Sequence, residues 1–291
     1  MPFEQPQSIR TVFFDAGFTL IRPNPSTAEI CQQVCQRLNL HIHIDEVKQR
    51  MTEAQDYYLR HMRLNRHTWG SEEAISEFWI GYYMNLLRPF IEEHDEHRLY
   101  QLALGINEEF DKHTSWQLYP DVMPALEALR SRGNYTLGVI SDWGISLGPI
   151  LRKLHLTPYF DCLLISAVTR HAKPSPMLYE LALQRANSIA DYTLHIGDSY
   201  IHDVLGARSV GITPVLLDRD RHLDESNVDC LLVHSLTELL DLLEVPRYIK
   251  SKEARLHIYL LAQNWYTTAT RYTISPASFL LNVSETRHAE A

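Results

Sequence analysis

A short apolar run, Val12–Phe14, ends abruptly in the single carboxylate of Asp15, and the turn-forming residues Gly17 and Thr19 follow at once. Four or five apolar residues bounded by turn chemistry are typical of a buried strand in a parallel sheet. Asp15 would then lie at the carboxyl end of that strand, where open α/β sheets bind their ligands. Two roles are open for Asp15: a nucleophile or metal ligand in a binding crevice, or a cap on the next turn.

Strand-like runs and helical patterns alternate through the second half of the chain. Strands are expected over Thr136–Ser141, Cys162–Ser166, Thr193–Gly197, Thr213–Leu217 and Leu231–Val233. Helices are expected over Asp121–Arg132, Ile145–His155, Pro176–Ala186 and His202–Val210. This alternation indicates a parallel sheet with right-handed crossovers and helices on both faces. The predicted fold class is α/β, with a Rossmann-like, doubly wound parallel sheet that also contains Val12–Phe14.

The segment between the first strand and about Lys112 is almost entirely helical in pattern. Apolar residues recur there at spacings of three and four over Thr27–Leu38, Asp45–Leu64, Glu72–Leu87 and Asp95–Asp111. Ser26, Asp45 and Ser71 are of residue types that cap helix N-termini. We therefore expect a four-helix cap inserted into the sheet domain directly after its first strand.

These patterns predict three parts of the chain. An α/β core would comprise residues 1–22 and 115–245, with the helical cap over residues 23–114. Residues 246–291 do not continue the alternation and form a C-terminal extension whose role the sequence does not assign. If the chain forms a homodimer, we expect the interface to involve the cap or this extension.

Composition narrows the class of partner. The formal net charge of −9 argues against nucleic acid as the main partner, because phosphate backbones need a basic surface. No apolar run approaches the roughly 20 residues that span a bilayer, and residues 1–10 lack the apolar core of a signal peptide. The four cysteines contain no C-x-x-C pair, so we expect reduced thiols and a cytoplasmic protein without a membrane partner.

Four chemically active side chains fall at or just beyond the carboxyl ends of predicted strands. They are Asp15, Ser141, Lys173 and Asp198. In a parallel sheet these ends lie along one edge, so two carboxylates, a hydroxyl group and an ammonium group would meet in one crevice. Any one of these residues alone is weak support for a site, but four on separate strands indicate an active site.

With these residues in place, the chain resembles the haloacid dehalogenase superfamily over residues 9–243. Asp15–Thr19 is similar to its first motif, Val139–Ser141 to its second and Lys173–Pro176 to its third. The fourth and most specific match is Gly197–Asp203, followed by Gly206-Ala207. The predicted helical cap lies between the first and second motifs.

The resemblance implies a role for each residue. Asp15 would attack phosphorus and form an aspartyl-phosphate. Ser141 would donate a hydrogen bond to a phosphoryl oxygen, and Lys173 would neutralise charge on the phosphoryl group and on Asp15.

The resemblance also implies a Mg²⁺ cofactor. The ion would be held by Asp15, the backbone carbonyl of Gly17 and Asp198. Asp203 would bind it through water, or would orient Lys173 and Ser199.

Two positions depart from the family pattern. Gly17 stands where the family's phosphatases carry a second Asp that protonates the leaving oxygen and later activates water. General acid–base help is typically worth roughly 10²–10⁴ in rate, so turnover is expected to be slow. Asp142 follows Ser141 where Asn is frequent. Its carboxylate would repel a dianion, act as a displaced acid or base, or point away towards the cap.

Three functions are consistent with the sequence. The first is Mg²⁺-dependent hydrolysis of a small phosphate ester. The second is cleavage of a carbon–halogen or other carbon–heteroatom bond by Asp15, and the third is a catalytically weak protein that binds a metal or a phosphorylated ligand.

Other residues of interest have more than one interpretation. Aromatic residues of the cap would contact substrate or simply pack; these are Tyr57, Tyr58, Trp69 and Trp79. The fifteen histidines show no metal-ligand spacing, and His195 alternates into a buried strand, so a structural role is expected for it.

Overall fold

The computed structural model describes residues 9–64, 68–132, 135–224, 226 and 228–244. Its centre is a six-stranded sheet in the order β5-β4-β1-β6-β7-β8. All five neighbouring pairs are parallel. The strands are β1 (Thr11–Phe14), β4 (Thr136–Ser141), β5 (Cys162–Ile165), β6 (Thr193–Gly197), β7 (Thr213–Leu217) and β8 (Leu231–Val233). The predicted parallel sheet is confirmed, with β1 paired between β4 and β6.

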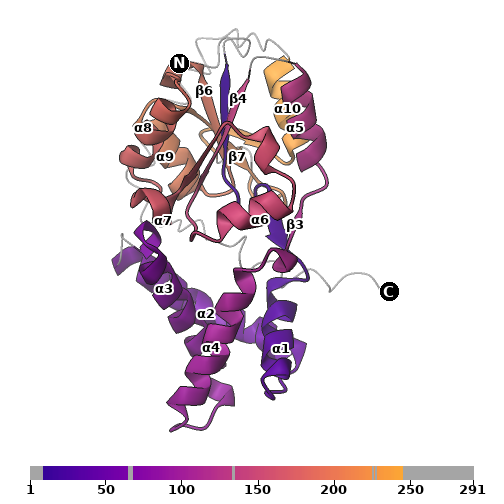
Figure 1. The fold of residues 1–291 in the computed structure, drawn as a ribbon, viewed down its shortest axis with the longest axis vertical. Helices are drawn as coiled ribbons and strands as arrows, with labels where there is room; N and C mark the ends of the chain where they lie inside the picture. The colour runs from indigo at the N-terminus through magenta and orange to yellow at the C-terminus, as the bar shows by residue number, and fades with distance from the viewer. Residues whose placement is uncertain (1–8, 65–67, 133–134, 225, 227, 245–291) are drawn as a thin grey trace.

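Helices cover both faces of this sheet (Figure 1). Val12 and Phe14 point into one apolar layer, whereas Phe13 points into the other, as strand alternation requires. The first layer contains α5 (Val122–Ser131), α6 (Leu147–Lys153) and α10 (Leu236–Glu244), and the second contains α8 (Pro176–Arg185) and α9 (Gly206–Ser209). The sheet is therefore doubly wound, as predicted.

Four helices between β1 and β4 form a separate body at one end of the sheet, which we call the helical insert (Figure 1). They are α1 (Thr27–Arg37), α2 (Ile44–Leu64), α3 (Glu72–Leu87) and α4 (Glu96–Phe110). Their apolar faces share a core of their own. Ser26 and Ser71 cap α1 and α3 as predicted. The prediction for Asp45 is wrong, because α2 begins at Ile44 and places Asp45 inside its first turn.

A two-stranded antiparallel ribbon joins the insert to the sheet domain. It pairs β2 (Ile21–Pro23) with β3 (Trp116–Leu118), so the chain enters and leaves the insert at neighbouring points. Each strand has three residues, too few for an alternating pattern to be recognised in the sequence. This ribbon was not predicted.

Smaller differences concern where helices begin and end. The helix expected over His202–Val210 starts earlier, as a π-helical turn over Tyr200–Leu205, and continues as α9. A single turn, α7 (Ser166–Thr169), and helix α10 were not predicted. The expected extension over residues 246–291 lies outside the described residues. Within the described part of the chain, no helix is both long and apolar enough to cross a bilayer.

Candidate active site

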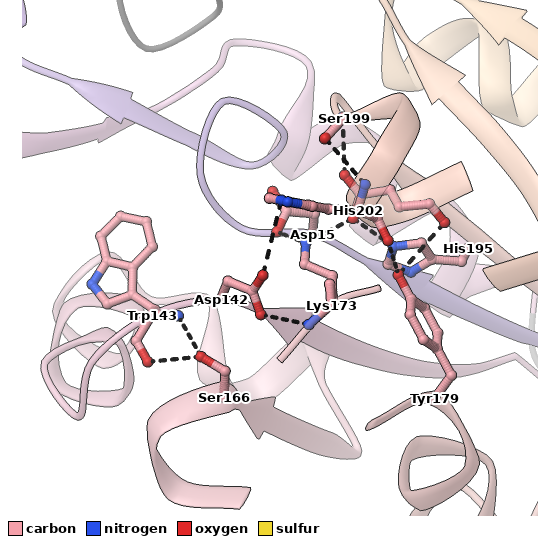
Figure 2. Close-up of polar contacts among 10 residues, drawn as sticks. Asp15, Asp142, Trp143, Ser166, Lys173, Tyr179, His195, Ser199 and His202 are labelled. Atoms are coloured by element: carbon pink, nitrogen blue, oxygen red, sulfur yellow. Dashed lines mark hydrogen bonds and ion pairs between the residues drawn. The ribbon is translucent and has the colours of Figure 1, made fainter. Parts of the chain in front are cut away.

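A buried ion cluster lies at the carboxyl ends of the central strands. The Lys173 ammonium donates to Oδ1 of Asp15 at 2.6 Å and to Oδ1 of Asp203 at 2.7 Å. Asp15 directly follows β1, whereas Asp203 comes from the π-helical turn after β6. All three residues are buried. Segments more than a hundred residues apart in the sequence thus converge on one charged centre (Figure 2).

The buried ionisable groups of this centre shift one another's pKa values. Burial alone would lower the pKa of Lys173, but the surrounding carboxylates of Asp15, Asp203 and Asp142 raise it well above its ordinary value. Burial alone would raise the pKa of Asp203, but Lys173 and His195 hold it well below its usual range. For Asp15, burial outweighs the opposing effect of Lys173, and the pKa is raised. Lys173 is therefore a fixed positive charge beside Asp15.

Asp203 is held from several sides. His195 in β6 donates from Nε2 to Oδ1 at 2.9 Å, and the Ser199 backbone N–H donates to Oδ2 at 3.0 Å. A Cβ atom on Gly197 would lie 2.2 Å from the Asp203 carboxyl carbon, so only glycine fits there. The Gly197–Asp203 segment is thus built around the Asp203 carboxylate.

Three carboxylates at this centre are arranged to bind a metal ion. Asp15, Asp198 and Asp203 each offer an oxygen atom, and these atoms all lie within 4.8 Å of one another. Carboxylate oxygens are the ligands that Mg²⁺ prefers in proteins. The donor set therefore fits the cofactor expected from the sequence.

A cavity of about 200 Å³ opens above the carboxylates, between the sheet domain and the helical insert. All six sequence-predicted site residues line it, namely Asp15, Gly17, Ser141, Lys173, Asp198 and Asp203. The insert contributes an aromatic wall of Tyr58, Trp69, Trp79, Tyr83 and Phe110. Tyr57 is not among the described lining residues. Its ring stacks with that of Phe78 inside the insert, 6.1 Å between centroids.

Trp143 occupies the space beside Gly17. A Cβ atom on Gly17 would lie 3.0 Å from Cζ3 of the indole, tighter than nine in ten real contacts. The indole in turn packs edge-on against Trp116, with 4.7 Å between ring centroids, and its Nε1 donates to the Ser146 hydroxyl at 3.3 Å. An aspartate at position 17 would need Trp143 to move.

Asp142 lines the same cavity, one of whose walls is the helical insert. Its Oδ1 accepts the Lys173 backbone N–H at 2.9 Å, and its Oδ2 lies 4.0 Å from Nδ1 of His202 (Figure 2). Burial raises the pKa of Asp142 to about 7, although Lys173 partly opposes the rise. A carboxyl group that exchanges its proton near neutral pH thus lines the cavity.

Several residues of the centre were missed or underrated at the sequence level. Trp143 and His202 line the cavity, and the hydroxyl of Tyr179 donates to the His202 carbonyl at 2.8 Å. His195 is fully buried and bonds directly to Asp203. A polar residue inside an otherwise apolar strand was the available signal for His195. Trp143 and Tyr179 carried no comparable signal.

Comparisons of the sequence and of the fold with those of known proteins point to the same family. The family model described as haloacid dehalogenase-like hydrolase matches residues 9–211. The haloacid dehalogenase-like hydrolase domain-containing protein 3 of Danio rerio is 28% identical over 223 residues, covering 74% of this chain and 89% of its own. A glyceraldehyde 3-phosphate phosphatase of Methanothermobacter thermautotrophicus is 28% identical over 134 residues, covering 43% and 58%. The magnesium-bound crystal structure of YfnB from Bacillus subtilis has the same fold, with a TM-score of 0.66, 21% identity and coverage of 81% and 99%.

Proposed function

Because this chain belongs to the haloacid dehalogenase-like hydrolases, we propose that it is a Mg²⁺-dependent hydrolase of small phosphate monoesters. The observation that carries the proposal is the buried ammonium of Lys173, 2.6 Å from Asp15 at the floor of a cavity. A buried cation beside a carboxylate and an open cavity suits an anionic substrate that the carboxylate must approach. The similarity to a phosphatase adds support for this substrate class.

In this proposal an oxygen of Asp15 attacks the phosphorus atom, and the bond from phosphorus to the alcohol oxygen breaks. The product is an aspartyl-phosphate, which splits one difficult displacement into two easier ones. Water then attacks phosphorus, and the bond to Asp15 breaks to release phosphate. Lys173 neutralises charge on Asp15 and on the phosphoryl oxygens. Ser141, buried at the end of β4, would donate a hydrogen bond to one of those oxygens.

Mg²⁺ would be held by Asp15, Asp198 and the backbone carbonyl of Gly17. Both carboxylate oxygens of Asp203 already accept hydrogen bonds, from Lys173, His195 and Ser199. We therefore assign Asp203 a water-mediated contact to the ion. When bound, the ion would neutralise part of the negative charge of the phosphoryl group.

The helical insert would act as a cap that excludes water and selects the substrate. Its Glu72 accepts a hydrogen bond from the Ile145 backbone N–H at 2.7 Å, which ties the insert to the loop after β4. The aromatic wall from Tyr58 to Phe110 favours an alcohol with an apolar or aromatic body. The four free cysteines are consistent with a reducing compartment, and we propose the cytoplasm.

An aryl phosphate assay tests the proposal. We expect release of phosphate that requires Mg²⁺ and falls at least about 10³-fold in Asp15→Asn. Asp45→Asn is the matched control, since it makes the same exchange at an exposed carboxyl group of α2 that is not among the cavity-lining residues. Halide release from a haloacid without metal would favour carbon–halogen cleavage instead. An absence of turnover with intact Mg²⁺ binding would favour a binding protein.

A further inference from the structure

We propose that Asp142 is the proton donor and acceptor of this site, in place of the carboxyl group that Gly17 lacks. This inference rests on the proposed phosphate ester hydrolysis. It selects one of the three roles that the sequence left open for the Asp142 carboxylate.

The position of Asp142 brings its side chain to the reaction edge of the sheet. It directly follows Ser141, the last residue of β4, and β4 is paired with β1, which leads to Asp15. Asp142 and Asp15 line the same cavity, and burial, with a smaller contribution from the negative charge of Asp15, raises the pKa of Asp142. A substrate seated over Asp15 would therefore lie within the space that Asp142 faces.

The two oxygens of Asp142 have different surroundings. Oδ1 accepts the Lys173 backbone N–H, which fixes the orientation of the carboxyl group. Oδ2 is buried and has no hydrogen-bond partner among the described residues. A buried oxygen without a partner is costly, and a leaving oxygen or an attacking water molecule would satisfy it. This geometry leaves one oxygen committed to the protein and one available to the substrate.

The groups that face Asp142 keep its proton exchangeable. Lys173, Asp15 and Asp203 act on it from three segments, and His202 faces Oδ2 from the π-helical turn. The Nδ1 atom of His202 lies 4.0 Å from Oδ2, beyond hydrogen-bond distance, so His202 leaves Oδ2 available to a substrate or a water molecule. Burial of Tyr58 in the insert raises the pKa of its phenol, and the charge of Asp142 raises it further, so Tyr58 remains neutral.

Asp142 gives up one proton in the first step and regains one in the second. As Asp15 bonds to phosphorus and the ester bond breaks, the alcohol oxygen takes the proton of the Asp142 carboxyl group and leaves as a neutral alcohol. As water attacks the aspartyl-phosphate, it gives one proton to the Asp142 carboxylate. Phosphate and the Asp15 carboxylate are released, and Asp142 regains its acid form. No further reactant is needed.

Dependence on the leaving group separates this role from a structural one. The test uses the full chain with Mg²⁺ and two substrates, phenyl phosphate and para-nitrophenyl phosphate. Phenolate is a poor leaving group, so its oxygen must be protonated as the ester bond breaks. The more stable para-nitrophenolate leaves with little protonation. We expect Asp142→Asn to lower turnover of phenyl phosphate by roughly 10²-fold or more, and turnover of para-nitrophenyl phosphate by much less. The basic limb of the pH–rate profile should also disappear for phenyl phosphate.

The amide in Asp142→Asn keeps an oxygen that can accept the Lys173 N–H, so the fold should persist, and thermal denaturation would verify it. Asp45→Asn, at an exposed position outside the cavity, is the control and should leave the turnover of both substrates unchanged. Equal losses for both substrates in Asp142→Asn, or an unchanged basic limb, would overturn the assignment to Asp142 while leaving the proposed function intact. Failure of the unsubstituted protein to hydrolyse either ester would overturn both.

Discussion

The indole of Trp143 lies 3.0 Å from the position that a Cβ atom on Gly17 would take. The place beside Asp15 where related phosphatases are expected to carry a second aspartate is thus filled by an aromatic ring. Since Trp143 also packs on Trp116 and bonds to Ser146, the ring is held there by its own contacts. The cost of replacing Gly17 by a residue with a side chain therefore depends on Trp143.

The first prediction concerns this pair. Gly17→Asp should lower the free energy of unfolding by about 1–3 kcal/mol, because it overpacks a filled space. The cost should shrink by about 1 kcal/mol or more when the substitution is made in a Trp143→Ala background. Urea denaturation of the four proteins in this cycle measures the coupling.

Gly148→Asp is the matched control for that cycle. Nothing lies within 4 Å of a Cβ at Gly148, which sits in the first turn of α6, where a carboxylate is favourable. We expect no loss of stability there. A Gly17→Asp cost that is the same with and without Trp143 would contradict the packing account.

The second prediction concerns Lys173. Lys173→Met leaves the buried carboxylates of Asp15 and Asp203 without their cation, which typically costs about 3–5 kcal/mol. The cost should be smaller at about pH 5 than at about pH 7, because the carboxyl groups can take up protons as the pH falls. Chemical denaturation at both pH values measures it. Lys153→Met, at an exposed position in α6, should change stability by less than about 0.5 kcal/mol.

Much of this site could be predicted from the sequence because its chemistry is local to strand ends. Each apolar run that ends in a polar residue places that residue at a known edge of the sheet, and topology brings the edges together. Asp15, Ser141 and Asp198 follow this rule, and all three line the cavity.

What could not be predicted depends on contacts between distant residues. Trp143 fills the space beside Gly17 because the loop after β4 brings the two residues together. No pattern of apolar residues in the sequence indicates that contact. A structural role was expected for His195, but its hydrogen bond to Asp203 was not. That bond forms because the π-helical turn after β6 places the Asp203 carboxylate next to the His195 ring. The three-residue strands β2 and β3 form through pairing across the whole insert, so their local pattern is too short to indicate them.

The third prediction concerns Mg²⁺. If Asp15, Asp198 and the Gly17 carbonyl bind the ion, with Asp203 in contact through water, and the unfolded chain does not bind it, Mg²⁺ should stabilise the protein. The gain should be about 2.7 kcal/mol when the free ion is about a hundred times its dissociation constant. Asp198→Ala should remove most of this gain, whereas Asp229→Ala, a carboxyl group outside the cluster that pairs with Arg208, should keep it. Thermal unfolding with Mg²⁺ and with a chelator checks the prediction. An equal gain in wild type and Asp198→Ala would place the ion elsewhere.

The fourth prediction concerns stability and pH through Asp142. Its pKa in the folded protein is raised from 3.8 to about 7, so the folded state holds a proton that the unfolded state has lost between these values. The stabilising contribution is therefore fully present below about pH 4 and declines as the pH rises through about 7. Its slope is about 1.4 kcal/mol for each pH unit inside this window. Asn at position 142 has no such proton, so the Asp142→Asn variant should gain about 2–3 kcal/mol relative to wild type between about pH 5 and pH 7. Urea denaturation without metal at both pH values measures the difference. If the two proteins differ in free energy of unfolding by the same amount at both pH values, Asp142 is ionised in the folded protein over this whole range.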